Sequence, residues 1–379
     1  MITTCSAVAL TLSVIVSLPQ QSEPAPRTLA PLPLRTGDVE FASIAGAREL
    51  RDGRVLVSDA GGPAIYIIDP RAGAVRTLGR EGAGPNEYRR PGGIYPDTGG
   101  GSFVLDRGQA RVLAVDAQGT LTGTRSIEVR GFSSAADDVD PRRVDGALHT
   151  YYSNPLGSPR ARPGGGGADS LPILRYDPVR QRSDTVGFLG RTRPTVISSE
   201  NGVTRTRTPI FSPADGWGVA SDGSVAIARV TPYRVEWIAP DGRRTTGTAI
   251  AYTPVAVTAA DREAREDLGQ SAAIGSRTAG GRTTTISTTG VEQVYADVKP
   301  AFDPEDIIVA PDGKVWVGRH EPARATHAVY DVFDRSGARV DRVALPPRAR
   351  VVGFGPTAVY AAELDADDIP QLRKYRLTR

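Results

Sequence analysis

A turn-plus-strand pattern recurs along this chain and constrains its fold more than any other feature. Six times, a glycine-containing turn leads into an alternating apolar strand. The six segments are Asp52–Asp59, Gly100–Asp106, Asp145–Tyr151, Asp222–Ala228, Asp312–Gly318 and Gly355–Ala361. Their starts lie 48, 45, 77, 90 and 43 residues apart. Self-similarity at such spacings is typical of repeat architectures, in which each repeat forms one supersecondary unit.

The surrounding sequence defines the unit that is repeated. Each strand is followed by a second apolar strand that often ends in Asp, such as Ile65–Asp69 and Val112–Asp116, and then by a turn and a third strand. An apolar stretch such as Gly92–Tyr95 precedes most of the first turns. Four short antiparallel strands over roughly 45 residues are typical of a propeller blade. The 42 Gly and 30 Pro exclude long helical bundles. We therefore predict an all-β, six-bladed β-propeller of four-stranded blades.

Six blades close into a ring without exposed sheet edges, so residues 27–379 are predicted to form a single domain. Residues near 40–80 would form the first blade and residues 349–379 the last. The last repeat ends at Leu377 after its third strand, so closure of the ring requires a strand from elsewhere. We expect Arg27–Leu34 to supply it beside Gln371–Leu377.

One part of the chain resembles the NHL repeat. Tyr88-Arg-Arg-Pro-Gly-Gly-Ile94 leads through a strand ending at Asp106 to Arg111–Val115, and Gly79–Tyr88 is similar to the linker between NHL blades. The match is good over residues 40–130, weaker over 209–245 and 300–345, and poor in the third repeat. The resemblance implies a six-bladed propeller and leaves the function open.

The amino-terminal residues indicate export. Ser6–Leu18 is an apolar run of the length of a signal-peptide core and short for a membrane span, and a Pro- and Gln-rich linker follows. Residues 1–26 are therefore predicted to be a signal peptide and linker, and the mature chain to be a monomer in the periplasm or secreted, without a transmembrane span. Arg heavily outnumbers Lys, which occurs only at Lys299, Lys314 and Lys374, as in bacteria with GC-rich genomes. The net charge of +3 argues against a nucleic-acid partner.

The two long spacings identify insertions at residues 157–168, 191–208 and 257–298. The last contains a predicted helix over Ala259–Leu268, with Thr258 as its cap. In a propeller, loops that join the second and third strands and loops that join successive blades emerge on the same face. We therefore expect all three insertions at one mouth of the central channel, and this face to be the functional one.

Candidate binding residues follow from that topology. Counted within the four-stranded blade, the second strand is the one that follows each repeated turn, and it ends toward the insertion-bearing face. The insertions carry more Arg than acid. The candidates are Arg319, His320, Glu321, Arg229, Asp59 and Asp106 at strand ends and Arg160, Arg193 and Arg207 in the insertions. Asp59 and Asp106 are equally typical turn residues of the repeat. A positive rim of this kind attracts anions.

No cofactor or metal site is predicted from the motifs. His149, His320 and His327 lack metal-ligand spacing, and the glycine run of residues 164–167 lacks the Lys-Ser/Thr of a phosphate loop. Gluconolactonase-like propellers hold a divalent cation in the channel through Glu, Asn and Asp. No matching set can be assigned here, although a channel cation stays open. The catalytic residues, if the protein has any, are unknown.

These observations leave two classes of function. In the first, the protein is an exported bacterial propeller that binds a small anionic ligand or an envelope protein through the insertion-bearing face. In the alternative, it is a hydrolase or lyase of the lactonase-like propeller type that uses the same channel mouth. Convergence of two or more acidic or His side chains at that mouth would favour the enzyme.

Overall fold

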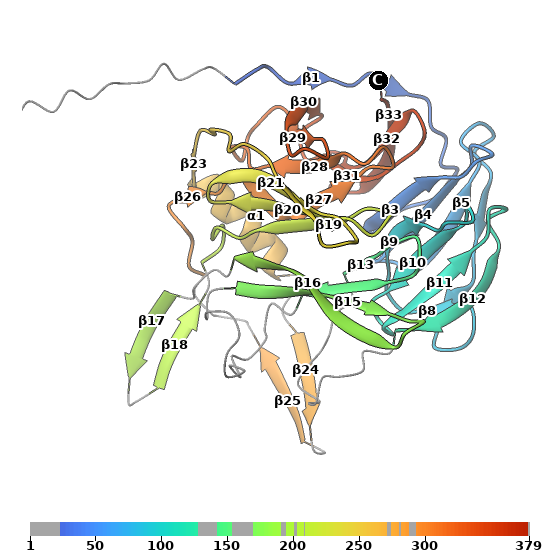
Figure 1. Cartoon of the computed structure of the whole chain (residues 1–379), viewed down its shortest axis with the longest axis horizontal. Helices are drawn as coiled ribbons and strands as arrows, with labels where there is room; N and C mark the ends of the chain where they lie inside the picture. Colours follow the sequence, from blue (N-terminus) through green and yellow to red (C-terminus); the bar gives the residue numbers. More distant parts are fainter. Residues whose placement is uncertain are drawn as a thin grey trace, which may run out of the picture.

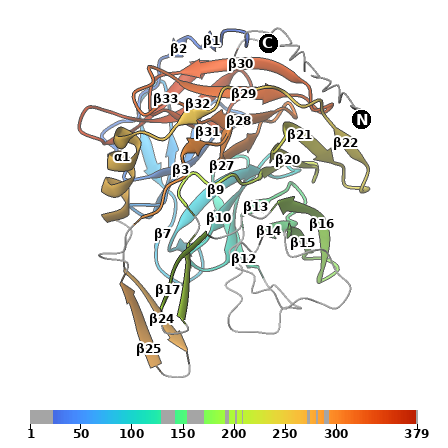
Figure 2. The same cartoon turned by 90° about the vertical axis from the view of Figure 1, so that its left-hand side faces the viewer.

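The protein is an almost entirely β structure in a propeller arrangement (Figures 1 and 2). The computed structural model describes residues 23–127, 142–153, 170–190, 195–200, 203–207, 209–270, 274–279, 282–287 and 293–377. Alternating apolar residues form its strands, and inward-facing Val, Ile, Leu and aromatic side chains form a core between neighbouring sheets.

Four sheets are separate blades with strands in sequential order. One contains β9 (Pro91–Pro96), β10 (Ser102–Asp106), β11 (Arg111–Val115) and β12 (Leu121–Ser126). The next contains β13 (Arg143–Val144), β14 (Thr150–Ser153), β15 (Ser170–Asp177) and β16 (Arg182–Gly190). A third contains β19 (Gly216–Val219), β20 (Val225–Val230), β21 (Tyr233–Ile238) and β22 (Arg244–Thr246). The fourth contains β27 (Phe302–Val309), β28 (Val315–Arg319), β29 (Ala328–Phe333) and β30 (Arg339–Leu345), with β1 (Arg27–Thr28) added along β30.

The remaining large sheet has eight strands where separate first and last blades were expected. Its members are β2 (Pro31–Leu32), β33 (Pro370–Arg376), β32 (Ala358–Leu364), β31 (Arg350–Phe354), β3 (Ile44–Glu49), β4 (Val55–Asp59), β5 (Ala64–Ile68) and β6 (Val75–Thr77), in that spatial order. Two antiparallel groups meet where β31 and β3 pair in parallel, Gly353 opposite Ala47. A Cβ on Gly353 would collide with the carbonyl oxygen of Ala47, so glycine permits this junction.

The amino-terminal segment closes the structure, partly as predicted. Pro31 and Leu32 of β2 pair antiparallel with Tyr375 and Lys374 of β33, which confirms the expected pairing for this part of the segment. Strand β1 instead pairs in parallel with β30, with Arg27 opposite Val343. The segment therefore bridges two neighbouring sheets, and Leu29 between the two strands is buried.

Smaller elements decorate the propeller. They are the pairs β7 (Arg80–Glu81) with β8 (Glu87–Tyr88), β17 (Thr195–Glu200) with β18 (Val203–Arg207), β23 (Val255–Ala256) with β26 (Val298–Lys299) and β24 (Ile274–Ala279) with β25 (Arg282–Ser287), together with helix α1 (Ala259–Gln270). The hairpins β17–β18 and β24–β25 project from the same side of the molecule in Figures 1 and 2. In the described residues, no helix is long and apolar enough to cross a membrane.

Helix α1 begins at a capping arrangement. The Thr258 amide donates to Asp261 Oδ2 at 2.8 Å, and the Asp261 amide donates to Thr258 Oγ1 at 3.4 Å. Lys299 Nζ lies 2.5 Å from Asp261 Oδ1, and both side chains are buried. This ion pair fixes the start of the helix against β26.

Candidate ligand-binding channel

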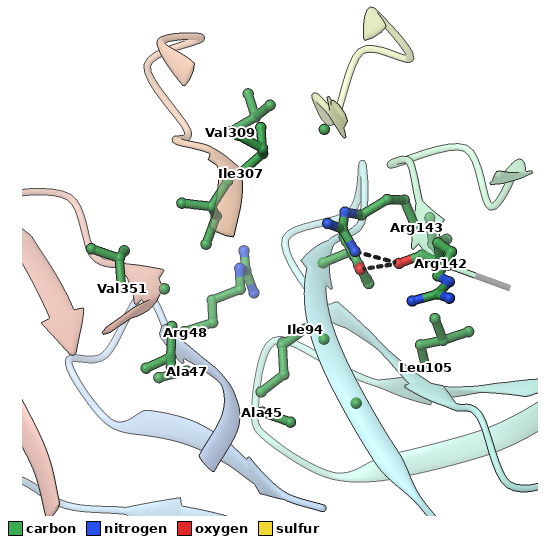
Figure 3. Close-up of a pocket in the computed structure, with 18 of the residues that line it drawn as sticks. Ala45, Ala47, Arg48, Ile94, Leu105, Arg142, Arg143, Ile307, Val309 and Val351 are labelled. Atoms are coloured by element: carbon green, nitrogen blue, oxygen red, sulfur yellow. Dashed lines mark hydrogen bonds between the residues drawn. The ribbon is translucent and has the colours of Figure 1, made fainter. Parts of the chain in front are cut away.

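One cavity lies where the inner strands of the five large sheets converge. It encloses about 500 Å³ and is lined by residues of β3, β9, β13, β19, β27 and β31, the first strands of the six sequence repeats. Figure 3 shows strands from several sheets surrounding this space, with Ala47, Ile94, Ile307 and Val351 on its walls. A cavity bounded by the first strand of every repeat is the central channel of a propeller.

The charged residues that line the channel are mostly basic. They are Arg48, Arg90, Arg107, Arg142, Arg143 and Arg350 against Asp303, Glu305 and Asp306. Arginine presents a fork of donors that matches carboxylate and phosphate groups, so this lining favours an anion.

Several of the channel arginines are fixed by backbone oxygens. Arg48 donates to Gly101 O at 2.9 Å, and burial lowers its pKa. Arg350 donates to Ile44 O at 2.8 Å. Arg143 Nη1 and Tyr95 Oη both donate to Arg142 O, at 2.9 and 3.0 Å, as the dashed lines in Figure 3 mark. Carbonyl partners hold these guanidiniums without neutralising their charge, whereas Arg142 pairs with Glu305 of the lining at 3.4 Å.

Asp306 is an acidic residue of the channel lining with an altered protonation equilibrium. Burial raises the pKa of Asp306 to about 6, although the hydrogen bond from Tyr330 and the charge of Arg350 both act to lower it. Tyr330 Oη donates to Asp306 Oδ2 at 2.6 Å and accepts from the Val351 amide at 2.9 Å. The neighbouring Asp303 carboxylate further raises the pKa of Asp306. This carboxyl group can therefore exchange a proton near neutral pH.

Two predicted site residues, Asp59 and Asp106, accept hydrogen bonds from backbone amides. Asp59 accepts from the amides of Ala42 and Ser43 at 2.7 Å, and from Gly61 at 3.0 Å. Asp106 accepts from the Arg90 and Gly108 amides and lies 3.3 Å from Arg111 Nε. Both side chains are buried and neither lines the channel. Their geometry matches the turn-residue alternative of the repeat.

The predicted residues at the ends of other second strands also lie outside the channel lining. Arg229 pairs with Asp215 at 2.7 Å and with Glu236 at 2.8 Å. Arg319 pairs with buried Asp331 at 2.9 Å. Arg319, His320 and Glu321 are not among the described residues that line the channel cavity, and their expected position at its mouth stays a prediction.

His320 and Glu321 contact the loops before β27. His320 Nδ1 lies 3.2 Å from Pro300 O, and its ring meets Phe211 edge to face at 5.4 Å. The Glu321 carbonyl oxygen accepts from Lys299 Nζ at 2.6 Å, and burial raises the pKa of the Glu321 carboxyl.

The expected position of the rim arginines at the channel mouth stays a prediction. Arg160, Arg193 and the insertion at residues 157–168 lie outside the described residues. Arg207 ends strand β18. Among the described residues, no group of three or more His, Cys, Asp and Glu is arranged to hold a metal ion.

The channel arginines were missed although the sequence carried a signal for several of them. Arg90 and Arg142 directly precede the first strands β9 and β13, and Arg350 begins β31. Aligning the six repeats at the start of the first strand would have brought these arginines to the same end of their strands. The predicted site residues came instead from the ends of second strands and from the insertions.

Comparison with known proteins gives a fold-level likeness. No protein-family model matches the chain, and no curated protein matches it. Solved structures that resemble it include a candidate exported protein of Bacteroides fragilis, with 13% identity, 93% of this chain and 95% of that chain covered, and a TM-score of 0.47.

Two further structures have named activities. A gluconolactonase of Xanthomonas campestris shows 12% identity, 93% and 95% coverage, and a TM-score of 0.43. A virginiamycin B lyase of Staphylococcus aureus shows 10% identity, 93% and 99% coverage, and a TM-score of 0.41. At these identities the likeness concerns the chain path, and the propeller assignment rests on the strand pairing described above.

Proposed function

We propose that this protein is an extracytoplasmic binding module whose central channel takes a small anionic ligand. The observation that carries the proposal is the arginine-rich lining of the roughly 500 Å³ channel. A cavity of this volume suits a small molecule rather than a folded partner. Export follows from the apolar run at residues 6–18 and stays a prediction.

The proposal includes the ring itself. We infer that the eight-stranded sheet is two blades, β3–β6 and β31–β33 with β2, joined by the parallel contact of β3 and β31. Counted in this way, the propeller has six blades, and the segment carrying α1 lies between the β19–β22 and β27–β30 blades. The similarity to NHL repeats stays a prediction from the sequence.

The test is a titration with defined anions. Citrate and inorganic phosphate are titrated calorimetrically into the wild-type chain and into R350Q. Loss of one charge-assisted contact should weaken binding by about 1–3 kcal/mol. Higher salt should weaken it further. The matched control is R71Q, because Arg71 lies in the turn between β5 and β6, away from the channel. Equal affinities of R350Q and R71Q would contradict an anion site in the channel.

A hydrolase or lyase of the lactonase-like type is the second candidate function, and Asp306 favours it. A carboxyl group with a pKa of about 6, next to a phenol and an arginine in a cavity, is suited to general acid–base chemistry. The six arginines of the described lining outnumber its three acids, so binding ranks first. Hydrolysis of gluconolactone by wild type but not by D306N would support the enzyme.

A further inference from the structure

A second cluster of arginines lies apart from the channel. Arg319 of β28 and Arg339 and Arg342 of β30 surround the fully buried carboxylate of Asp331 on β29. The three side chains are 5%, 15% and 10% exposed. Buried guanidiniums are stable only with good carboxylate partners, and Asp331 supplies a single negative charge.

The second partner comes from the amino-terminal segment. Glu23 Oε1 lies 3.3 Å from Arg319 and 3.4 Å from Arg339, and Glu23 Oε2 lies 3.2 Å from Arg342. Arg342 Nη1 also donates to Pro24 O at 2.7 Å. Arg319 and Arg342 lie closer to Asp331, at 2.9 and 3.1 Å, and Arg339 lies 3.4 Å from either carboxylate. Glu23 is also the most exposed member of the cluster, at 24%.

The surroundings favour one more anion contact. The Arg319 Nε hydrogen is buried and finds no hydrogen-bond acceptor within the described part of the chain. Tyr233 Oη donates to Asp331 Oδ2 at 2.9 Å, and the Arg319 guanidinium lies over the rings of Tyr233 and Tyr252. Glu321 lies close enough to Arg319 and Arg342 for their charges to oppose the rise in its pKa. With Glu23 withdrawn, three guanidiniums face at most two carboxylates.

We propose that Arg319, Arg339 and Arg342 form a carboxylate-binding site between the β19–β22 and β27–β30 blades, which Glu23 occupies as an internal ligand. A carboxylate in trans, from a small dicarboxylate or from an acidic peptide, binds there when Glu23 leaves. The fork geometry of arginine suits planar carboxylates, and three convergent guanidiniums suit a ligand that replaces both Glu23 oxygens. The site is separate from the channel, since none of these residues lines it.

The experiment compares the full-length wild type with E23Q. Succinate and a short blocked peptide containing Glu-Pro are titrated into each by calorimetry. E23Q should bind at least one of the two probes about tenfold more tightly than wild type, because the internal competitor has lost its charge. The tighter probe identifies the source of the carboxylate. Addition of R339Q to E23Q should abolish the gain, whereas addition of R90Q in the channel should leave it intact.

Two results would overturn the site. One is equal affinity of wild type and E23Q for both probes. The other is a gain in E23Q that R90Q removes and R339Q does not, which would assign the binding to the channel. If E23Q does not fold, wild type provides the readout, since succinate or the peptide should accelerate trypsin cleavage after Arg27 by displacing the segment. Cleavage unchanged by both probes would contradict the proposal.

Discussion

Two acidic residues of the same blade show how one fold treats carboxylates in opposite ways. Asp331 on β29 contacts three guanidiniums and the phenol of Tyr233. Asp306 on β27 has the phenol of Tyr330 as its hydrogen-bond partner, and burial raises its pKa to about 6. The strands place Asp331 between blades and Asp306 in the channel. A fully paired charge holds two blades together, whereas an incompletely compensated acid lies where a ligand would enter.

The largest effect should follow from removing residues 1–34. The truncated chain loses Glu23 from the cluster, the buried Leu29, and the pairings of β1 and β2. Denaturant unfolding should show a free energy of unfolding lower by several kcal/mol. The truncated chain loses a buried apolar side chain, exposes two strand edges and leaves buried arginines without one carboxylate partner. The channel lining contains no residue from this segment, so anion binding by the folded fraction should persist. Equal free energies of unfolding for the truncated and full chains would contradict a stabilising role for this segment.

Replacing the shared acid of the cluster should cost nearly as much. D331N leaves Arg319, Arg339 and Arg342 buried with Glu23 as their remaining contacting carboxylate, and we expect a loss of about 3 kcal/mol in unfolding free energy. D341N is the matched control, because Asp341 pairs with the partly exposed Arg27 at 2.7 Å and such pairs contribute about 0–1 kcal/mol. Equal losses in D331N and D341N would show that burial does not distinguish the two pairs.

The repeat and the ring could be predicted from the sequence because both depend on local patterns. Alternating apolar residues and Asp-Gly turns indicate strands and their order without reference to distant residues. The junction of β3 with β31 could not be predicted, since it depends on a close approach at Gly353 that no local pattern reveals. Glycine at that position reads equally well as an ordinary strand residue.

The sites were harder to predict than the fold. Arg319 was a predicted binding residue, but its partner Glu23 is far from it in sequence, and its partner Asp331 lies diagonally across from it on the neighbouring strand β29. The number of guanidiniums around one carboxylate is a property of packing between blades. The channel arginines depend on where the first strand of each repeat begins, a position that is defined only once the repeats are superposed.

A smaller and pH-dependent effect is expected at Asp306. Its pKa of about 6 in the folded chain exceeds the value of about 4 of an unfolded Asp, so folding binds a proton between these values. Stability associated with this group is therefore greatest below about pH 4 and is lost as the pH rises through 6. D306N should be more stable than wild type at pH 7.5 by on the order of 1–2 kcal/mol, and the difference should disappear near pH 4. A difference in unfolding free energy between the two proteins that stays constant from pH 4 to 8 would contradict the raised pKa of Asp306.

The smallest change in stability is expected at Arg90, the counterpart in the channel of the buried arginines. Arg90 is exposed directly before β9, and its guanidinium makes no hydrogen bond or ion pair with the described residues. R90Q should therefore alter the unfolding free energy by less than about 0.5 kcal/mol, as is usual for a surface substitution. R342Q, in contrast, removes contacts to Asp331, Glu23 and Pro24 and should destabilise the chain clearly. Citrate binding should show the reverse order, with R90Q weakened and folded R342Q unchanged. If R90Q keeps full affinity for citrate, the exposed arginines of the channel serve solubility rather than recognition.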